Sequence, residues 1–132
     1  MNLFVSFHVD DIERAKAFYS ALGLTVNEAM SDHNTSCFVL DDDKFLMIST
    51  RAAYAAVGGT EELVGTSGTP SPITLSWAMS SREEVDALLE RAEKAGGRIG
   101  DTDDYDFMYQ RQFDDPEGYH YSPFWMKPET GA

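Results

Sequence analysis

The sequence predicts an α+β fold made of two βαβββ modules, whose curved mixed sheets surround a shared cavity. A strand, a helix and three further strands follow one another in residues 1–50, and the same order returns in residues 72–126. Each module is too short to bury both faces of its own sheet, so the two modules are expected to pair their sheets. We therefore expect a single domain over residues 1–132, with a connection at 51–71.

The first module opens with a strand at 3–9, in which two sets of side chains alternate with a period of two. Asp10 or Asp11 then caps a helix over residues 12–22. Gly23 ends this helix, because glycine readily adopts the left-handed conformation that follows a helix. The apolar residues of the predicted helix recur at helical spacing, and they are Ile12, Ala15, Phe18, Tyr19 and Leu22.

The rest of the first module reads as strands joined by polar turns. We expect three strands, at residues 24–29, 35–40 and 44–50. The connection that follows is rich in Gly, Thr, Ser and Ala, and residues 52–57 within it are expected to form a short helix. The remainder is long enough for a lid or a linker.

The second module repeats the pattern with a strand at 72–79 and a helix capped by Ser80 or Ser81. Glu84 completes a capping box. The helical stripe consists of Val85, Leu88, Leu89 and Ala92. After a Gly pair at 96–97 we expect a short strand at 98–100, an acidic loop at 101–106, a strand at 107–113, a turn at 114–118 and a last strand at 119–126.

The charge and cysteine content exclude several classes of protein. A formal net charge of −13 and a pI near 4.3 argue against a nucleic-acid partner, because phosphate binding requires a basic surface. An acidic surface also disfavours anionic membranes, no apolar run approaches the roughly 20 residues of a membrane span, and the N-terminus does not resemble a signal peptide. Cys37, the only cysteine, is expected to be a small buried hydrophobe in a protein of the reducing cytoplasm.

Short motifs in both modules resemble those of the vicinal oxygen chelate superfamily. They are V-x-D at residues 9–11, F-Y at 18–19, L-G at 22–23 and D-P-E-G-Y at 115–119. This superfamily includes glyoxalase I, extradiol dioxygenases, and fosfomycin and bleomycin resistance proteins. The resemblance covers nearly the whole chain, and it implies a glyoxalase-like fold and a homodimer.

The resemblance also implies four positions for the ligands of a divalent metal. Counted from the motifs, these positions hold Phe4, Met47, Pro72 and Ser122. The first three side chains cannot bind a hard metal ion, and a neutral hydroxyl is a poor ligand. We therefore expect no metal and no other cofactor. A divalent metal held by displaced ligands is the alternative.

Alternation along the strands predicts which side chains line the cavity. The resulting surface is mostly apolar with a few hydroxyl and imidazole groups, as is common in small-molecule sites. A packed core uses the same residue types, but the serine hydroxyls would each need a partner there. The predicted ligand-binding residues are Phe4, Ser6, His8, Phe45, Met47, Ser49, Thr74, Ser76, His120, Ser122 and Phe124, and Pro72 falls on the same face.

His8 and His120 are the candidates for catalysis, because imidazole exchanges protons near neutral pH. A single His on a strand is also commonly a hydrogen-bonded structural residue. His33 lies in a polar turn and is expected to face solvent. Arg111 and the glutamines beside it offer groups for a polar ligand, but alternation alone leaves open which of them faces inward.

These observations predict a metal-independent protein of the glyoxalase/bleomycin resistance type. Its partner is expected to be a small molecule, partly aromatic or amphipathic, that it binds or sequesters. The alternative is a metal-dependent enzyme of the same superfamily, either a glyoxalase-like lyase or an extradiol dioxygenase, with displaced ligands. A third hypothesis is an interaction module whose cavity is filled by its own side chains.

Overall fold

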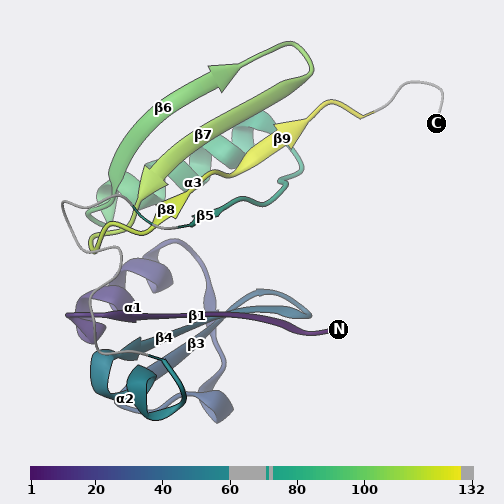
Figure 1. The fold of residues 1–132 in the computed structure, drawn as a ribbon. Helices are drawn as coiled ribbons and strands as arrows, with labels where there is room; N and C mark the ends of the chain where they lie inside the picture. The colour runs from purple at the N-terminus through teal and green to yellow at the C-terminus, as the bar shows by residue number, and fades with distance from the viewer. Residues whose placement is uncertain (60–70, 72, 129–132) are drawn as a thin grey trace. The chain divides into compact units, whose positions relative to one another are not determined.

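The computed structural model describes residues 1–59, 71 and 73–128 (Figure 1). The chain divides into two compact units, Met1–Val64 and Gly65–Ala132. Most of the predicted connection, together with Pro72, lies outside the described residues. None of the helices described has the length and apolar character that a membrane crossing requires.

The first unit contains a mixed sheet in the order β1-β4-β3-β2. Its first strand, β1, runs parallel to the fourth, while the other neighbours are antiparallel. The strands are β1 (Leu3–Val9), β2 (Thr25–Val26), β3 (Thr35–Asp41) and β4 (Lys44–Thr50). Three of the four predicted strands are thus found with nearly the expected ends.

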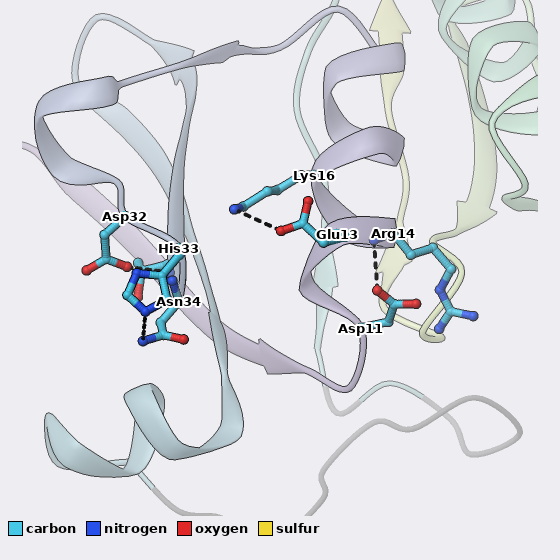
Figure 2. Close-up of polar contacts among 8 residues, drawn as sticks. Asp11, Glu13, Arg14, Lys16, Asp32, His33 and Asn34 are labelled. Atoms are coloured by element: carbon cyan, nitrogen blue, oxygen red, sulfur yellow. Dashed lines mark hydrogen bonds and ion pairs between the residues drawn. The ribbon is translucent and has the colours of Figure 1, made fainter.

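Helix α1 (Ile12–Ala21) begins at Asp11, whose carboxylate Oδ1 accepts a hydrogen bond of 3.0 Å from the backbone N–H of Arg14 (Figure 2). This bond satisfies one of the free N–H groups of the first turn. The side chains predicted for the buried stripe are buried at Ala15, Phe18, Tyr19 and Leu22. Gly23 follows with φ of 100°, the left-handed conformation predicted for it.

The prediction of a strand at 24–29 is correct only for Thr25 and Val26 and is wrong for the residues that follow. β2 has two residues, and a 3-10 helix η1 (Glu28–Met30) follows it. The Ser31 hydroxyl donates to the Asn27 carbonyl over 2.7 Å and accepts from the Cys37 N–H over 2.9 Å. A serine that bonds local backbone in this way favours a turn over a continued strand. The short helix expected at 52–57 is confirmed as α2 (Arg51–Ala56).

The second unit repeats the topology of the first, with the order β5-β8-β7-β6 and with β9 also paired to β7. Again the first strand is parallel to the fourth. The strands are β5 (Thr74–Leu75), β6 (Arg98–Asp104), β7 (Met108–Asp114), β8 (His120–Tyr121) and β9 (Phe124–Met126). The repeat and the α+β class are confirmed.

Helix α3 (Arg82–Lys94) has the predicted capping arrangement. The Ser81 hydroxyl accepts from the Glu84 N–H over 3.1 Å, and the Glu84 carboxylate in turn accepts from the Ser80 hydroxyl over 2.7 Å. The four residues of the predicted stripe are its buried residues. Figure 1 shows α3 lying along β7, so the helix covers one face of this sheet.

Three predictions for the second unit need correction. The acidic loop at 101–106 is strand as far as Asp104, because β6 pairs with β7 through Asp103 and Gln110 after a bulge. The strand at 72–79 is reduced to β5, with an isolated bridge at Ala78. The last strand is interrupted between β8 and β9, where Pro123 has no N–H to donate to a sheet.

Candidate functional site

In the first unit, the face of the sheet opposite α1 carries six of the predicted ligand-binding residues. Phe7 points toward α1, since its ring lies 6.4 Å from that of Tyr19. Neighbouring strand residues point to opposite faces, so Phe4, Ser6 and His8 lie on the other face. Register places each of these beside a residue of β4, in the pairs Phe4 with Phe45, Ser6 with Met47 and His8 with Ser49.

An open aromatic pair dominates this face. The rings of Phe4 and Phe45 are stacked, with centroids 4.7 Å apart and planes 16° apart. Phe4 is 39% exposed, and Phe45 is partly exposed. The next pair along these strands is Ser6 with Met47. Ser6 is exposed and Met47 is half-buried. The face therefore offers a flat apolar surface with a hydroxyl beside it.

Helix α2 covers the other end of the same face. His8 is only 4% exposed, and the Tyr54 ring meets its imidazole edge-on at a centroid distance of 5.1 Å. The Ser49 hydroxyl lies 3.2 Å from the Thr35 hydroxyl, so that buried group is satisfied. The sequence did not predict that Tyr54 of α2 lies over His8. The catalytic role suggested for His8 stays a prediction.

Cys37 lies beside Met47 on this face and is fully buried. Burial raises the pKa of its thiol, so the nucleophilic thiolate is disfavoured. His33 is exposed in the turn before β3, where Asp32 accepts from the N–H of Asn34 (Figure 2). Neither residue belongs to a candidate catalytic group.

The second unit has a different surface on the equivalent face. Tyr109 and Arg111 point toward α3, because both donate hydrogen bonds to the Asp86 carboxylate, over 2.6 and 2.9 Å. Gln110, Gln112 and Asp114 therefore lie on the face opposite α3, which settles the orientation that alternation had left open. Arg111 is not available to a ligand on that face.

Polar residues form a row across this sheet. Thr74 of β5 pairs with His120 of β8, His120 pairs with Asp114 of β7, and Asp114 pairs with Arg98 of β6. Residues that pair in register share a face of the sheet. A hydroxyl, an imidazole, a carboxylate and a guanidinium thus stand side by side.

His120 makes two short hydrogen bonds within this row. Its Nδ1 lies 2.6 Å from Oδ1 of Asp114, and its Nε2 lies 2.7 Å from Oε1 of Gln112. The side chains of His120 and Asp114 are each 28% exposed, so solvent reaches the cluster. Sequence reasoning had named His120 but had assigned Asp114 to a turn. The alternation of Gln112 and Asp114 across the turn from His120 is the signal that links them.

The remaining predicted residues of this unit are more scattered. Phe124 pairs with Gln110 and so shares the His120 face, and it is partly exposed. Ser122 is 4% exposed and ties the chain to β5 through a 2.8 Å bond from its N–H to the Leu75 carbonyl. Ser76 is exposed outside the strands. Pro72 lies outside the described residues.

Comparison with known proteins agrees with this architecture. Residues 2–40 match a family described as bleomycin resistance protein-like N-terminal. A glyoxalase/bleomycin resistance protein/dioxygenase family enzyme from Burkholderia phytofirmans PsJN is 19% identical, with 93% of this chain and 96% of that chain covered and a TM-score of 0.73. The chain has the glyoxalase/bleomycin resistance fold. The predicted resemblance to the vicinal oxygen chelate superfamily is confirmed.

Two other solved structures share the glyoxalase/bleomycin resistance fold. A glyoxalase-related enzyme from Fulvimarina pelagi is 17% identical, covering 95% of this chain and 87% of that chain, with a TM-score of 0.76. A lactoylglutathione lyase from Agrobacterium tumefaciens is also 17% identical, covering 95% and 92%, with a TM-score of 0.70. No curated protein matches the sequence.

The metal centre implied by this superfamily does not fit the residues at its expected positions. Phe4 is stacked on Phe45, Met47 offers only a thioether, and Ser122 offers a neutral hydroxyl. Within the part of the chain that the structure describes, no three His, Cys, Asp or Glu side chains are grouped to hold a metal ion. The donor set therefore disagrees with the metal sites of the metal-dependent members.

The α3 side of the second sheet holds a separate polar cluster that supports the fold. The hydrogen bond from Tyr109 and the charge of Arg111 lower the pKa of the Asp86 carboxyl below its ordinary value. Burial, followed by the bond to Asp86, raises the pKa of the Tyr109 hydroxyl. The Arg82 guanidinium lies 5.0 Å from the Tyr109 ring centroid and 5.1 Å from that of Trp125, as in cation–π contacts.

Proposed function

We propose that the protein binds a small, partly aromatic or amphipathic compound without a metal, as a binding or sequestering protein of the glyoxalase/bleomycin resistance type. The open stack of Phe4 and Phe45 is the observation that carries this function. Large aromatic side chains are usually buried, and an accessible pair offers a face on which another ring can stack. We further propose that the protein is a cytoplasmic homodimer.

The neighbours of this pair support an amphipathic ligand. Ser6 follows two residues after Phe4 on the same face and is exposed, so a polar group on the ligand has a hydroxyl within the same surface. Met47, its partner on β4, adds a flexible apolar side chain that adapts to different ligand shapes. An apolar surface with few polar groups is typical of small-molecule sites.

The test uses 1-anilinonaphthalene-8-sulfonate, which is both aromatic and amphipathic, as the probe. Its fluorescence is expected to rise on binding the wild type. Phe4→Ala should weaken binding about tenfold, since a lost stacking contact and lost apolar area together amount to roughly 1.5 kcal/mol. Leu3→Ala is the matched control, because Leu3 is also exposed but lies on the opposite face of the same strand.

Two results would contradict the proposal. Equal binding by Phe4→Ala and the wild type, with unfolding transitions unchanged, would show that the aromatic pair is not a ligand surface. Loss of binding after dialysis against EDTA, restored by one divalent metal, would favour the competing function of a metal-dependent lyase or dioxygenase.

A further inference from the structure

Asp114, His120 and Gln112 are brought together on the second sheet and have no part in the function proposed above. The three come from β7 and β8, and their side chains are joined by hydrogen bonds of 2.6 and 2.7 Å. β8 has only two residues, so one reading of the cluster is that it ties this short strand to β7. The side chains of His120 and Asp114 are exposed to solvent, however, which favours a binding role in addition to this structural one.

An oxygen atom lies at each nitrogen of the His120 ring. A neutral imidazole has one N–H donor and one acceptor nitrogen, so two such oxygens match the protonated ring, in which both nitrogens donate. A carboxylate at Nδ1 fixes the orientation of the ring, because a charged acceptor forms the stronger of the two bonds. The partner at Nε2 is a neutral amide on a flexible side chain. Gln112 is therefore the replaceable partner, and Asp114 is the positioning residue.

We propose that Nε2 of His120 is a binding site for a carboxylate or carbonyl oxygen of a small molecule, which takes the place of the Gln112 amide oxygen. The exchange replaces one N–H···O bond with another, so it leaves no buried donor without an acceptor. The 28% exposure of the His120 side chain gives a ligand access to the ring. The inference goes beyond the proposed function, because it concerns a separate site within the second unit.

The surroundings favour an oxygen acceptor on an aromatic or apolar body. Arg98, an exposed cation, pairs with Asp114 in register and so lies on the same face as His120. Thr74 pairs with His120 from the other side and adds an exposed hydroxyl. Phe124, on the same face, offers a partly exposed ring for the apolar body.

The probe is benzoate, which carries an aromatic ring and a carboxylate, and the readout is the ring nitrogen signals of His120 in protein labelled with ¹⁵N-histidine. Benzoate is expected to shift the Nε2 signal saturably while the Nδ1 signal stays near its starting value. Benzylamine is the control ligand, because it has the same ring but no acceptor oxygen. On a chain with net charge −13, general electrostatic attraction would favour benzylamine instead.

Variants separate a binding role from a structural one. Gln112→Ala removes the competing acceptor and should increase benzoate affinity about fivefold, the value of one ordinary hydrogen bond. Gly100→Ala should change the affinity much less than Gln112→Ala, because its new Cβ would lie 3.3 Å from the Cβ of Gln112 and require a shift of only a few tenths of an ångström. His33→Gln, in an exposed turn, should leave affinity unchanged.

The proposal is overturned if benzoate leaves the His120 signals unchanged, or if a folded Gln112→Ala variant binds benzoate no more tightly than the wild type. The cluster would then only hold β8 against β7. The outcome is distinct from a failure of the proposed function, which is measured at Phe4 with a different probe. A shift at His120 together with unchanged probe binding by Phe4→Ala would retain this site and reject the aromatic surface.

Discussion

The two units share a topology and differ in the chemistry of one sheet face. In each, the first strand pairs in parallel with the fourth, and one helix covers one side of the sheet. The open side of the first sheet carries the stacked Phe4 and Phe45, while the equivalent side of the second carries the row that contains His120 and Asp114. In both units the helix-covered face supplies the buried apolar core, to which the second unit adds the cluster of Asp86 and Tyr109, while the other face differs in its chemistry.

The largest expected effect on stability concerns the sheet faces covered by α1 and α3, which are equivalent in the two units. Phe38 and Phe113 are both fully buried on this side of their sheets. Phe38→Ala and Phe113→Ala should each lower the free energy of unfolding by about 3–5 kcal/mol, because each leaves a cavity in a packed core. Urea unfolding measures both values. A loss below about 1 kcal/mol in one variant alone would show that the two cores are not equivalent.

The next effect concerns the helix caps, which occupy corresponding places in the two units. Asp11 caps α1 and Ser81 caps α3 through one hydrogen bond each. Asp11→Ala and Ser81→Ala should each cost about 1 kcal/mol of unfolding free energy. Ser20→Ala, at an exposed position of α1, is the control and should change stability by less than about 0.5 kcal/mol. A cost confined to one of the two caps would limit the equivalence to topology.

The smallest effect depends on pH and on the second unit alone. The bonds from Tyr109 and Arg111 hold the pKa of Asp86 below its ordinary value of 3.8. A carboxyl whose pKa is depressed in the folded state adds stability above its unfolded pKa, and that stability is lost as the pH falls through the folded pKa. Because Asp86 is 47% exposed, the loss in Asp86→Asn should stay below about 1 kcal/mol.

Urea unfolding of Asp86→Asn and the wild type tests this expectation at neutral pH and at a pH well below 3.8, where the carboxyl is protonated in the folded protein as well. The stability difference should be largest at neutral pH and should vanish in acid. Glu90→Gln, on the exposed side of α3, provides the control. A difference that persists unchanged in acid would mean that the Asn side chain itself disturbs the packing.

Local signals in the sequence were sufficient for most of the fold. The caps at Asp11 and Ser81 and the apolar stripes of α1 and α3 depend on residues within one or two turns, so spacing alone predicts them. The strand predicted at 98–100 was found as the start of β6, but its continuation to Asp104 was missed, because an edge strand with one solvent-exposed face tolerates aspartates that otherwise indicate a loop. The extent of β5 and β8 depends on partners far away in the sequence, which periodicity does not report.

The candidate sites were also only partly predictable, because they too depend on residues that are distant in the sequence. Alternation placed Phe4, Ser6 and His8 on one face, but it did not reveal that Tyr54 of α2 lies over His8. The contact of His120 with Gln112 and Asp114 depends on the register between β7 and β8, which a turn sets and a one-residue shift would destroy. Side-chain contacts between residues of different strands are therefore the features that a single sequence predicts least well.

The parallel pairing of first and fourth strands also bears on how the chain folds during synthesis. β3 and β4 can form a local hairpin, but β1 has no neighbour in its sheet until β4 arrives. Pairing over such a long interval carries a large loop-closure entropy and slows folding. Each unit is therefore committed to its native sheet only when its last strands have left the ribosome, and until then β1 is an unpaired edge that chaperones or other nascent chains can meet.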